Sequence, residues 1–145
     1  MTPNTKMISE LFSDFELLKS RKEKLEFLKK YKQHAMLKAV LQGTFDPNIQ
    51  WCLDVPSYIP DEAPLGLNPS NLFMEMPKCT IFAKGHPKGA GLKPERMKQL
   101  LIQVLESMHP AESMIFEQMI KKKLKVKGLT EKLVLEVFPD LYRKV

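Results

Sequence analysis

The sequence has no apolar run near the length of a membrane-spanning helix, and its first residues include no uninterrupted apolar stretch of the kind that signal peptides carry. It contains only two cysteines, Cys52 and Cys79, and neither belongs to a C-x-x-C pair. Without an export signal, two reduced, buried thiols are expected rather than a disulfide. The histidines His34, His86 and His109 stand at no spacing that would complete a zinc site with them. These absences predict a cytoplasmic protein without a membrane span, a metal site or a cofactor.

Known catalytic sequence motifs are also missing. There is no H-E-x-x-H string and no Ser-His-Asp order, and the glycine-rich run at 85–91 continues as Leu-Lys where a P-loop needs Lys followed by Ser or Thr. His109 precedes a proline, and a histidine there typically caps or packs at a helix junction rather than acting as an acid or base. Asp61, Glu62 and Glu106 show no recurring metal-ligand spacing. A binding protein is therefore expected, with an enzyme of unrecognised site as a third alternative.

Helical periodicity dominates the first third of the chain. Its 145 residues, 43% hydrophobic and 28% charged, can bury one modest core, so a single domain is expected. Apolar residues recur every three or four positions over 8–31, with a break near Ser20, which forms a capping-box pattern with Glu23. A third helix is expected over 35–42, with Gly43 as its terminator.

The middle of the chain is rich in proline. Asp46 and the proline after it predict the start of a short helical turn that buries Phe45, Ile49 and Trp51. Residues 54–69 then hold four prolines, which favours a long irregular loop. Because this loop also carries large apolar residues, we expect it to pack across the helices, and we call it the strap.

The second half returns to helices. Ser70 is expected to cap a brief helix that runs to Met74 and that Pro77 ends or bends, and 83–91 is expected to be the most flexible segment. Further helices are predicted over 93–108, 111–123 and 130–138. The fold class is therefore mainly α, a compact single-domain bundle of about six helices, with N-terminal helices in 8–51, the strap at 54–69 and C-terminal helices in 93–138.

Positive charge is what the sequence has in excess, with a net charge of +6. Residues 1–72 hold nine Lys or Arg against nine Asp or Glu, whereas residues 73–145 hold fourteen against eight. The whole excess therefore lies in the second half, which predicts an anionic partner. It gathers in a first cluster, made up of Lys84, Lys88, Lys93, Arg96 and Lys98, and a second cluster, made up of Lys121, Lys122, Lys123, Lys125 and Lys127.

Lysine-rich clusters usually contact phosphates as point charges and do not read bases. We therefore expect salt-sensitive, weakly sequence-specific binding of nucleic acid, with duplex DNA as the expected form. An acidic protein surface is the alternative partner, and a plain solvated surface is the alternative to any binding site. A helix C-terminus would by itself account for one or two lysines of the second cluster.

Methionine supports a competing interpretation. Nine are present, and those of the second half include Met74, Met76, Met108, Met114 and Met119. Such residues either fill the core or line an adaptable protein-binding groove. The alternative function is a protein-interaction module that engages a replication, transcription or defence protein through the strap and the methionine-bearing helices.

Three strings carry a family resemblance: LQGTFDPNIQW at 41–51, LESMHPAE at 105–112 and KGLTEKLV at 127–134. With them the chain resembles a family of small proteins of T4-like bacteriophages, including those that infect cyanobacteria, a family without an agreed function. The resemblance implies a phage accessory protein that works in the cytoplasm of the infected cell.

Residues 8–51 are also similar to the helical N-terminal DNA-binding region of phage ATP-dependent DNA ligases. Such ligases adenylate the lysine of a K-x-D-G motif, and no lysine here is followed by x-Asp-Gly. This likeness therefore implies a helical module that lies on duplex DNA without the catalytic half.

Overall fold

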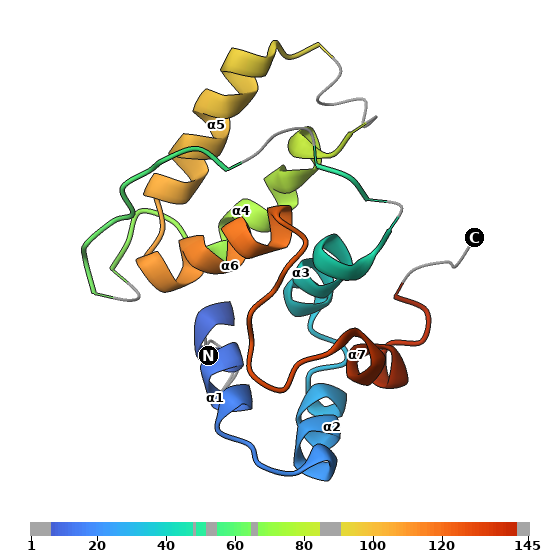
Figure 1. The fold of residues 1–145 in the computed structure, drawn as a ribbon. Helices are drawn as coiled ribbons and strands as arrows, with labels where there is room; N and C mark the ends of the chain where they lie inside the picture. The colour runs from blue at the N-terminus through green and yellow to red at the C-terminus, as the bar shows by residue number, and fades with distance from the viewer. Residues whose placement is uncertain (1–6, 48, 52–54, 65–66, 85–90, 142–145) are drawn as a thin grey trace.

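The computed structural model describes residues 7–47, 49–51, 55–64, 67–84 and 91–141. These residues form helices and no strand, with one isolated bridge between Trp51 and Ala83 (Figure 1). The elements are α1 (Ile8–Glu16), α2 (Arg21–Lys30), α3 (Ala35–Phe45), α4 (Leu72–Glu75), the 3-10 helix η1 (Met76–Phe82), α5 (Pro94–Glu106), α6 (Pro110–Ile120) and α7 (Glu131–Val137). Six of the α-helices have seven residues or more, so the prediction of a mainly α bundle of about six helices is confirmed.

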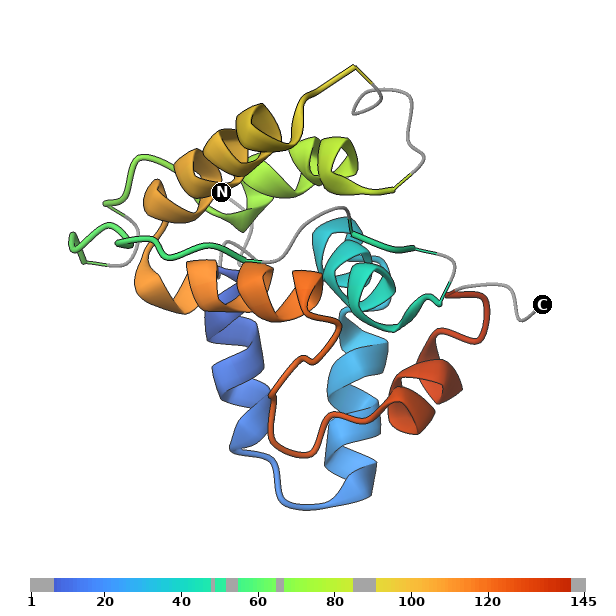
Figure 2. The same cartoon turned by 45° about the horizontal axis from the view of Figure 1, so that its top comes forward.

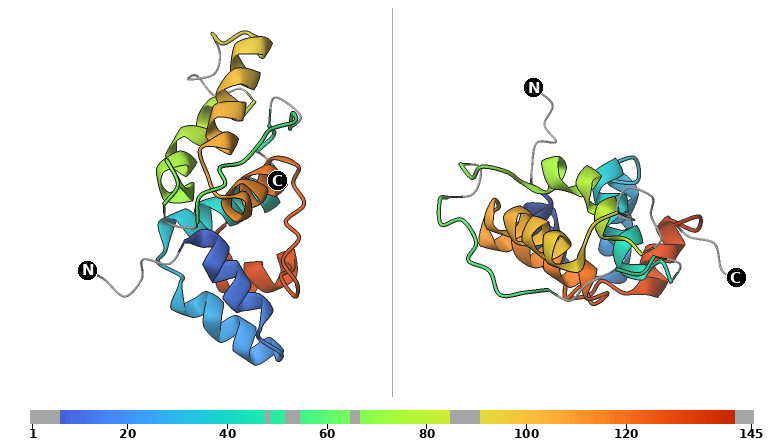
Figure 3. Two further views of the ribbon diagram at one scale, coloured as in Figure 1. Left: turned by 90° about the vertical axis from the view of Figure 1, so that its left-hand side faces the viewer. Right: turned by 90° about the horizontal axis from the view of Figure 1, so that it is seen from above.

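The helices form three tiers along one long axis (Figures 1 and 3). α5 and the α4–η1 segment make up one end, where Figure 2 shows them side by side. α1, α2 and α7 make up the other end, and α3 and α6 pack against each other between them. A single cluster of buried side chains joins the tiers, and its largest fully buried members are the rings of Phe15, Phe82, Phe116 and Phe138.

The boundary between α1 and α2 follows from local chemistry. Ser20 Oγ accepts a hydrogen bond from the Glu23 backbone N–H at 3.1 Å, and the Ser20 N–H donates back to Glu23 Oε1 at 3.2 Å. These reciprocal bonds satisfy N–H groups that the first turn of a helix leaves free. The predicted capping box is confirmed.

Gly43 was expected to end the third helix, and this is wrong. The helix α3 continues through Phe45, and Gly43 lies inside it. A Cβ atom at Gly43 would stand 2.7 Å from Met119 Sδ of α6. The glycine therefore lets α6 approach the backbone of α3, which is a tertiary role that chain position alone does not indicate.

The prediction of a helical turn that begins at Asp46 is also wrong for the described residues. Asp46 is the C-cap of α3, because its N–H donates to the Gln42 carbonyl at 2.9 Å. A single bond from the Ile49 N–H to the Asp46 carbonyl, at 3.2 Å, follows it. Phe45 and Trp51 are half-buried against the core rather than enclosed in it.

The strap does pack across the helices, as predicted. Its backbone N–H groups at Ile59 and Asp61 donate to Glu106 Oε2 at 2.9 Å and to the Met108 carbonyl at 3.0 Å. The Ser70 N–H donates to a further carbonyl in the same α5–α6 connection, at 2.8 Å. The described part of the strap is thus held against the junction between α5 and α6.

Ser70 was expected to cap the short helix after the strap, and this is wrong. Asn71 is the N-cap, since its side chain accepts from the Met74 N–H at 3.2 Å. The Ser70 hydroxyl donates instead to the buried Glu75 carboxylate at 2.7 Å. The α-helix gives way to the 3-10 helix at Met76, directly before Pro77, because proline has no N–H to continue the ladder of α-helical hydrogen bonds.

The last three helices match their predictions closely. α5 buries Met97, Leu101, Val104 and Leu105 on one stripe. His109 caps α6, with its Nδ1 accepting from the N–H two residues later at 3.1 Å. The N-cap of α7 is the threonine predicted for it. α6 ends at Ile120, three residues earlier than 123.

Glu112, in the first turn of α6, is a buried carboxylate with 1% of its surface exposed. Its Oε2 accepts from the Ser9 N–H of α1 at 2.7 Å, and its Oε1 accepts from the Leu72 N–H of α4 at 3.2 Å. The starts of three helices therefore meet at one negative charge. The free N–H groups and partial positive charges of helix N-termini stabilise that charge in the interior.

Replacing Glu112 by alanine should lower the free energy of unfolding by about 2–5 kcal/mol, because two buried N–H groups lose a charged acceptor. Urea denaturation followed by circular dichroism measures the change. The matched control is Glu26→Ala on the exposed face of α2. Equal unfolding free energies for the two variants would contradict the role of Glu112.

Candidate nucleic-acid interface

The second cluster begins with the turn that ends α6. The Lys122 N–H donates to the Met119 carbonyl and the Lys123 N–H to the Gln118 carbonyl, both at 3.0 Å. This is the Schellman pattern, which normally places glycine at the position of Lys122. Lys122 has a φ of 61°, a left-handed conformation that costs a non-glycine residue about 1–2 kcal/mol. Some compensating interaction is therefore expected.

The side chain of Lys122 supplies that compensation. Its Nζ donates to the carbonyl oxygens of Gly43 at 3.0 Å, Asp46 at 2.7 Å and Ile49 at 2.9 Å. An ammonium has three N–H groups, and the end of α3 carries partial negative charge that favours it. Burial lowers the pKa of Lys122, and the nearby charge of Asp46 opposes that shift. The Lys122 ammonium is thus engaged inside the protein.

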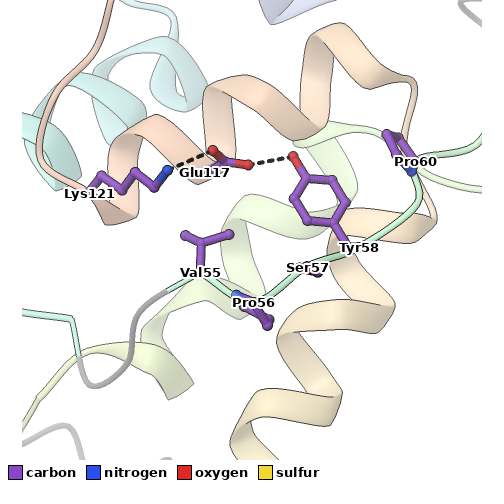
Figure 4. Close-up of a pocket in the computed structure, with 7 residues that line it drawn as sticks. All are labelled: Val55, Pro56, Ser57, Tyr58, Pro60, Glu117 and Lys121. Atoms are coloured by element: carbon purple, nitrogen blue, oxygen red, sulfur yellow. Dashed lines mark hydrogen bonds and ion pairs between the residues drawn. The ribbon is translucent and has the colours of Figure 1, made fainter.

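Lys121 is paired on the surface. Its Nζ lies 2.9 Å from Glu117 Oε2, and Tyr58 Oη of the strap donates to Glu117 Oε1 at 2.8 Å (Figure 4). Partial burial alone would raise the pKa of Glu117, but these two hydrogen bonds and the charges of Lys121 and Lys125 lower it overall. An open pocket of about 450 Å³ lies between the strap and α6 at this point. Lys121, like Lys122, is therefore engaged by groups of the protein itself.

The remaining lysines of the second cluster form an ordered row. Lys123, Lys125 and Lys127 are exposed, whereas Leu124 and Val126 between them pack against the core. This alternation is the period of an extended chain, in which neighbouring side chains point to opposite sides. None of the three forms an ion pair with another described residue. We call Lys123, Lys125 and Lys127 the lysine row.

Backbone hydrogen bonds hold the lysine row in place. The Lys125 N–H donates to Gln118 Oε1 at 2.9 Å, and the Lys127 N–H donates to Glu16 Oε2 at 3.0 Å. The row is thereby tied to α6 at one end and to α1 at the other. Figures 1 and 2 show the chain passing between α1 and α2 after the end of α6 and then crossing α2 on its way to α7.

Beyond the row, the chain meets further cations from α2. Gly128 turns the chain with a φ of +83°, and a side chain there would collide with the Lys24 ammonium. A pocket of about 190 Å³ opens beside this turn, and we call it the basic pocket. It is lined by Arg21, Lys24, Gly128, Thr130, Lys132 and Leu133.

The lysine row with Lys24 and Lys132 makes up a basic face that the sequence patterns indicate only in part. Lys24 lies in residues 1–72, where positive and negative charges are equal in number. The net charge of that half therefore gives no indication of Lys24. Lys132 was not assigned to either cluster. In contrast, the alternation of lysine with apolar residues at 123–127 can be recognised directly in the sequence.

The first cluster lies elsewhere. Lys93, Arg96 and Lys98 are exposed on the first turns of α5, Lys84 is exposed after η1, and Lys88 lies outside the described residues. The start of α5 is at the end of the molecule opposite the tier that the lysine row crosses (Figures 1 and 3). The two clusters therefore do not combine into one surface.

Within the described ranges, no group of three or more His, Cys, Asp or Glu could hold a metal ion, and no helix is long and apolar enough to cross a membrane. Burial raises the pKa of Cys79 to about 11, which keeps its thiol protonated. Cys52 and His86 lie outside the described residues.

Replacing Lys122 by methionine should lower the free energy of unfolding by about 1–3 kcal/mol, because three carbonyl groups at the end of α3 lose their donor. The neighbouring Lys123→Met is the control, since its side chain is exposed and its effect should stay within about 0.5 kcal/mol. Chemical denaturation of both variants tests this. A destabilisation no larger at Lys122 than at Lys123 would show that the three bonds contribute nothing.

Tyr58 gives a pH-dependent signal. Burial, the hydrogen bond to Glu117 and the charge of that carboxylate raise the pKa of Tyr58. As the pH rises, the hydroxyl of Tyr58 therefore loses its proton in the unfolded chain before it does so in the folded protein. The stability that this hydroxyl contributes is fully present below a pH of about 10 and falls as the pH rises further. A spectrophotometric titration of the three tyrosines should contain a late phase that Tyr58→Phe removes. Loss of absorbance change from the main phase, with the late phase unaltered in the variant, would argue against the Tyr58–Glu117 bond.

The sequence profile of a family of unknown function (DUF6433) matches residues 13–126. The match extends from within α1 to within the lysine row, well over half of the chain. No curated protein matches the chain. The protein therefore belongs to the DUF6433 family.

Proposed function

We propose that this protein binds nucleic acid, with duplex DNA as the expected form, through the basic face. The observation that carries the proposal is the lysine row, three exposed ammonium groups that point outward in regular alternation without ion-pair partners among the described residues. A polyanion releases its condensed counterions when such groups approach, which favours association.

The acidic residues around the face do not cancel it. Glu117 is held by Lys121 and Tyr58, and Glu136 by Arg21. Glu16 accepts the backbone N–H of the lysine row. The charges of Glu117 and Glu136 are thus paired with cations of the protein, while the ammonium groups of the row face solvent. This arrangement supports an electropositive surface.

The composition of the face favours contact with the phosphate backbone. In an extended chain, alternate side chains are about 6.6–6.8 Å apart, so the lysine row presents evenly spaced point charges. Proteins that bind single strands usually add aromatic rings on which bases stack. The described residues that line the basic pocket include no aromatic side chain. Duplex binding with little sequence preference fits these features best.

The structure changes which lysines the proposal uses. Lys122 is left out because its ammonium is bound to the end of α3. The first cluster is a separate surface, which we treat as a second region to be tested independently. Lys24 and Lys132 are added.

The triple variant Lys123→Gln, Lys125→Gln, Lys127→Gln should weaken binding to a short fluorescent duplex roughly tenfold to a hundredfold at low salt. The slope of log affinity against log salt should become shallower by about 2–3, roughly one for each phosphate that is no longer neutralised. Fluorescence anisotropy measures both quantities.

The matched control is Lys93→Gln, Arg96→Gln, Lys98→Gln on α5, which removes the same charge from the other end of the molecule. Weakened binding confined to this control would assign the interface to the first cluster. If the unmodified protein fails to bind any oligonucleotide at low salt, the proposed function is wrong.

The setting is part of the proposal: a non-enzymatic accessory protein of a T4-like bacteriophage, acting in the cytoplasm of the infected cell. Support comes from the strings at 41–51 and 105–112, which resemble such phage proteins and which hold Gly43 and part of the α5–α6 connection. A coding gene in a bacterial chromosome away from any prophage would overturn this setting.

Exposed apolar side chains favour a second candidate, the protein-interaction module. Ile59 and Leu67 of the strap are each 74% exposed, and Met74 and Met114 are each 55% exposed. The other second-half methionines of the predicted groove, Met76, Met108 and Met119, are buried in the core. Exposed apolar side chains can mark a protein-interaction site, and the partner of this second candidate would be a replication, transcription or defence protein.

Capture of partners from infected-cell lysate, with nuclease added, tests this candidate. The tagged protein should recover a stoichiometric partner that a variant with Ile59→Ser and Leu67→Ser fails to recover. Recovery of no such partner would remove its main support.

A further inference from the structure

We propose that the basic pocket receives the terminal phosphate monoester of a nucleic-acid strand, so that the protein prefers phosphorylated ends. This inference rests on the proposed function and assigns a specific ligand group to one part of the basic face. The pocket is formed by the first turns of α2 on one side and by the turn at 128–133 on the other.

The shape of the pocket sets it apart from the lysine row. The row is an exposed ridge, whereas the pocket is a hollow of about 190 Å³. Gly128 has no side chain to fill the hollow, and the half-buried Lys24 ammonium lies where such a side chain would stand. Leu133 is buried and adds an apolar wall. A small anion can therefore contact both walls of the hollow at once, while the row can only be contacted from outside.

The charges suit a dianion. Lys24 and Lys132 form no ion pair with another described residue, so two positive charges stay uncompensated. A phosphate monoester carries about −1.5 to −2 at pH 7, whereas each internal phosphate of a strand carries one negative charge. Arg21 pairs with Glu136, but a guanidinium has five N–H groups and retains donors for a second acceptor.

A hydroxyl donor completes the pocket. Thr130 Oγ1 accepts the Leu133 N–H at 3.2 Å as the N-cap of α7. This bond uses a lone pair of the hydroxyl and leaves its hydrogen to donate to an anion. The three terminal oxygens of a phosphate monoester are strong acceptors and match this set of ammonium, guanidinium and hydroxyl donors.

The position of the pocket explains why a strand end is the expected source. Lys127 is the last member of the lysine row, and Gly128 of the pocket follows it directly in the chain. A duplex whose backbone lies along the row would therefore reach the pocket at one end of the interface. An internal phosphodiester carries a nucleotide on each side, whereas a terminal phosphate carries only one and can enter the half-open hollow more easily.

Anisotropy titrations of internally labelled duplexes of one sequence test the inference, with 5′-phosphate, 3′-phosphate or hydroxyl ends. A terminal phosphate should raise affinity about tenfold, the effect expected of added charge-assisted hydrogen bonds. Lys24→Gln with Lys132→Gln should abolish this preference. The control Lys22→Gln with Lys29→Gln removes the same charge from exposed positions of α2 outside the pocket and should keep it.

The outcomes separate the two proposals. Binding that is equal for phosphate and hydroxyl ends would overturn the inference and leave the proposed function standing. Absence of binding to every duplex would overturn both. A preference that survives in the Lys24 and Lys132 variant would place the phosphate elsewhere and overturn the assignment of the pocket. Calorimetry with inorganic phosphate and a nucleoside monophosphate distinguishes the source, because affinity equal to that of a phosphorylated duplex would assign the pocket to free phosphate compounds instead of strand ends.

Discussion

The contact between the Lys122 ammonium and the end of α3 is the interaction on which the central tier and the basic face both depend. It joins two helices that are far apart in the sequence, with three bonds from one side chain to carbonyl groups of Gly43, Asp46 and Ile49. The left-handed turn that aims this side chain inward also directs the following residues outward from the end of α6. Lys122 thus stabilises the fold, whereas the three lysines of the lysine row remain exposed.

A buried charge, Glu112, complements it at the other end of α6. Glu112 accepts N–H groups at the starts of α1 and α4, where helices carry partial positive charge, and Lys122 donates to carbonyl groups at the end of α3, where they carry partial negative charge. α6 therefore organises its neighbours through their unsatisfied ends as well as through apolar packing. Both charged groups bind N–H or C=O groups at helix ends, which would otherwise need water as their hydrogen-bond partner.

The distribution of charge in space differs from its distribution along the chain. The excess of positive charge belongs to the second half of the sequence, yet the basic face also takes Lys24 from α2, and the basic pocket takes Arg21. Lys122 of the second cluster, in turn, is withdrawn from the surface. What distinguishes the face from an ordinary solvated helix is that backbone bonds to Gln118 and Glu16 hold its segment against two helices.

Local chemistry was sufficient to predict the helices, the capping box at Ser20, the cap at Thr130 and a strap that packs, because each depends on neighbours within a few residues or on apolar content. The sequence also contains the alternation of lysine with apolar residues at 123–127, but no extended segment was predicted from it. Local chemistry could not show that Gly43 lies inside α3 or that Lys122 points inward, since both depend on α3 and α6 meeting across more than seventy residues of chain. Only the tertiary structure decided which lysines face solvent, because burial and hydrogen bonding are set by the partners that folding brings together.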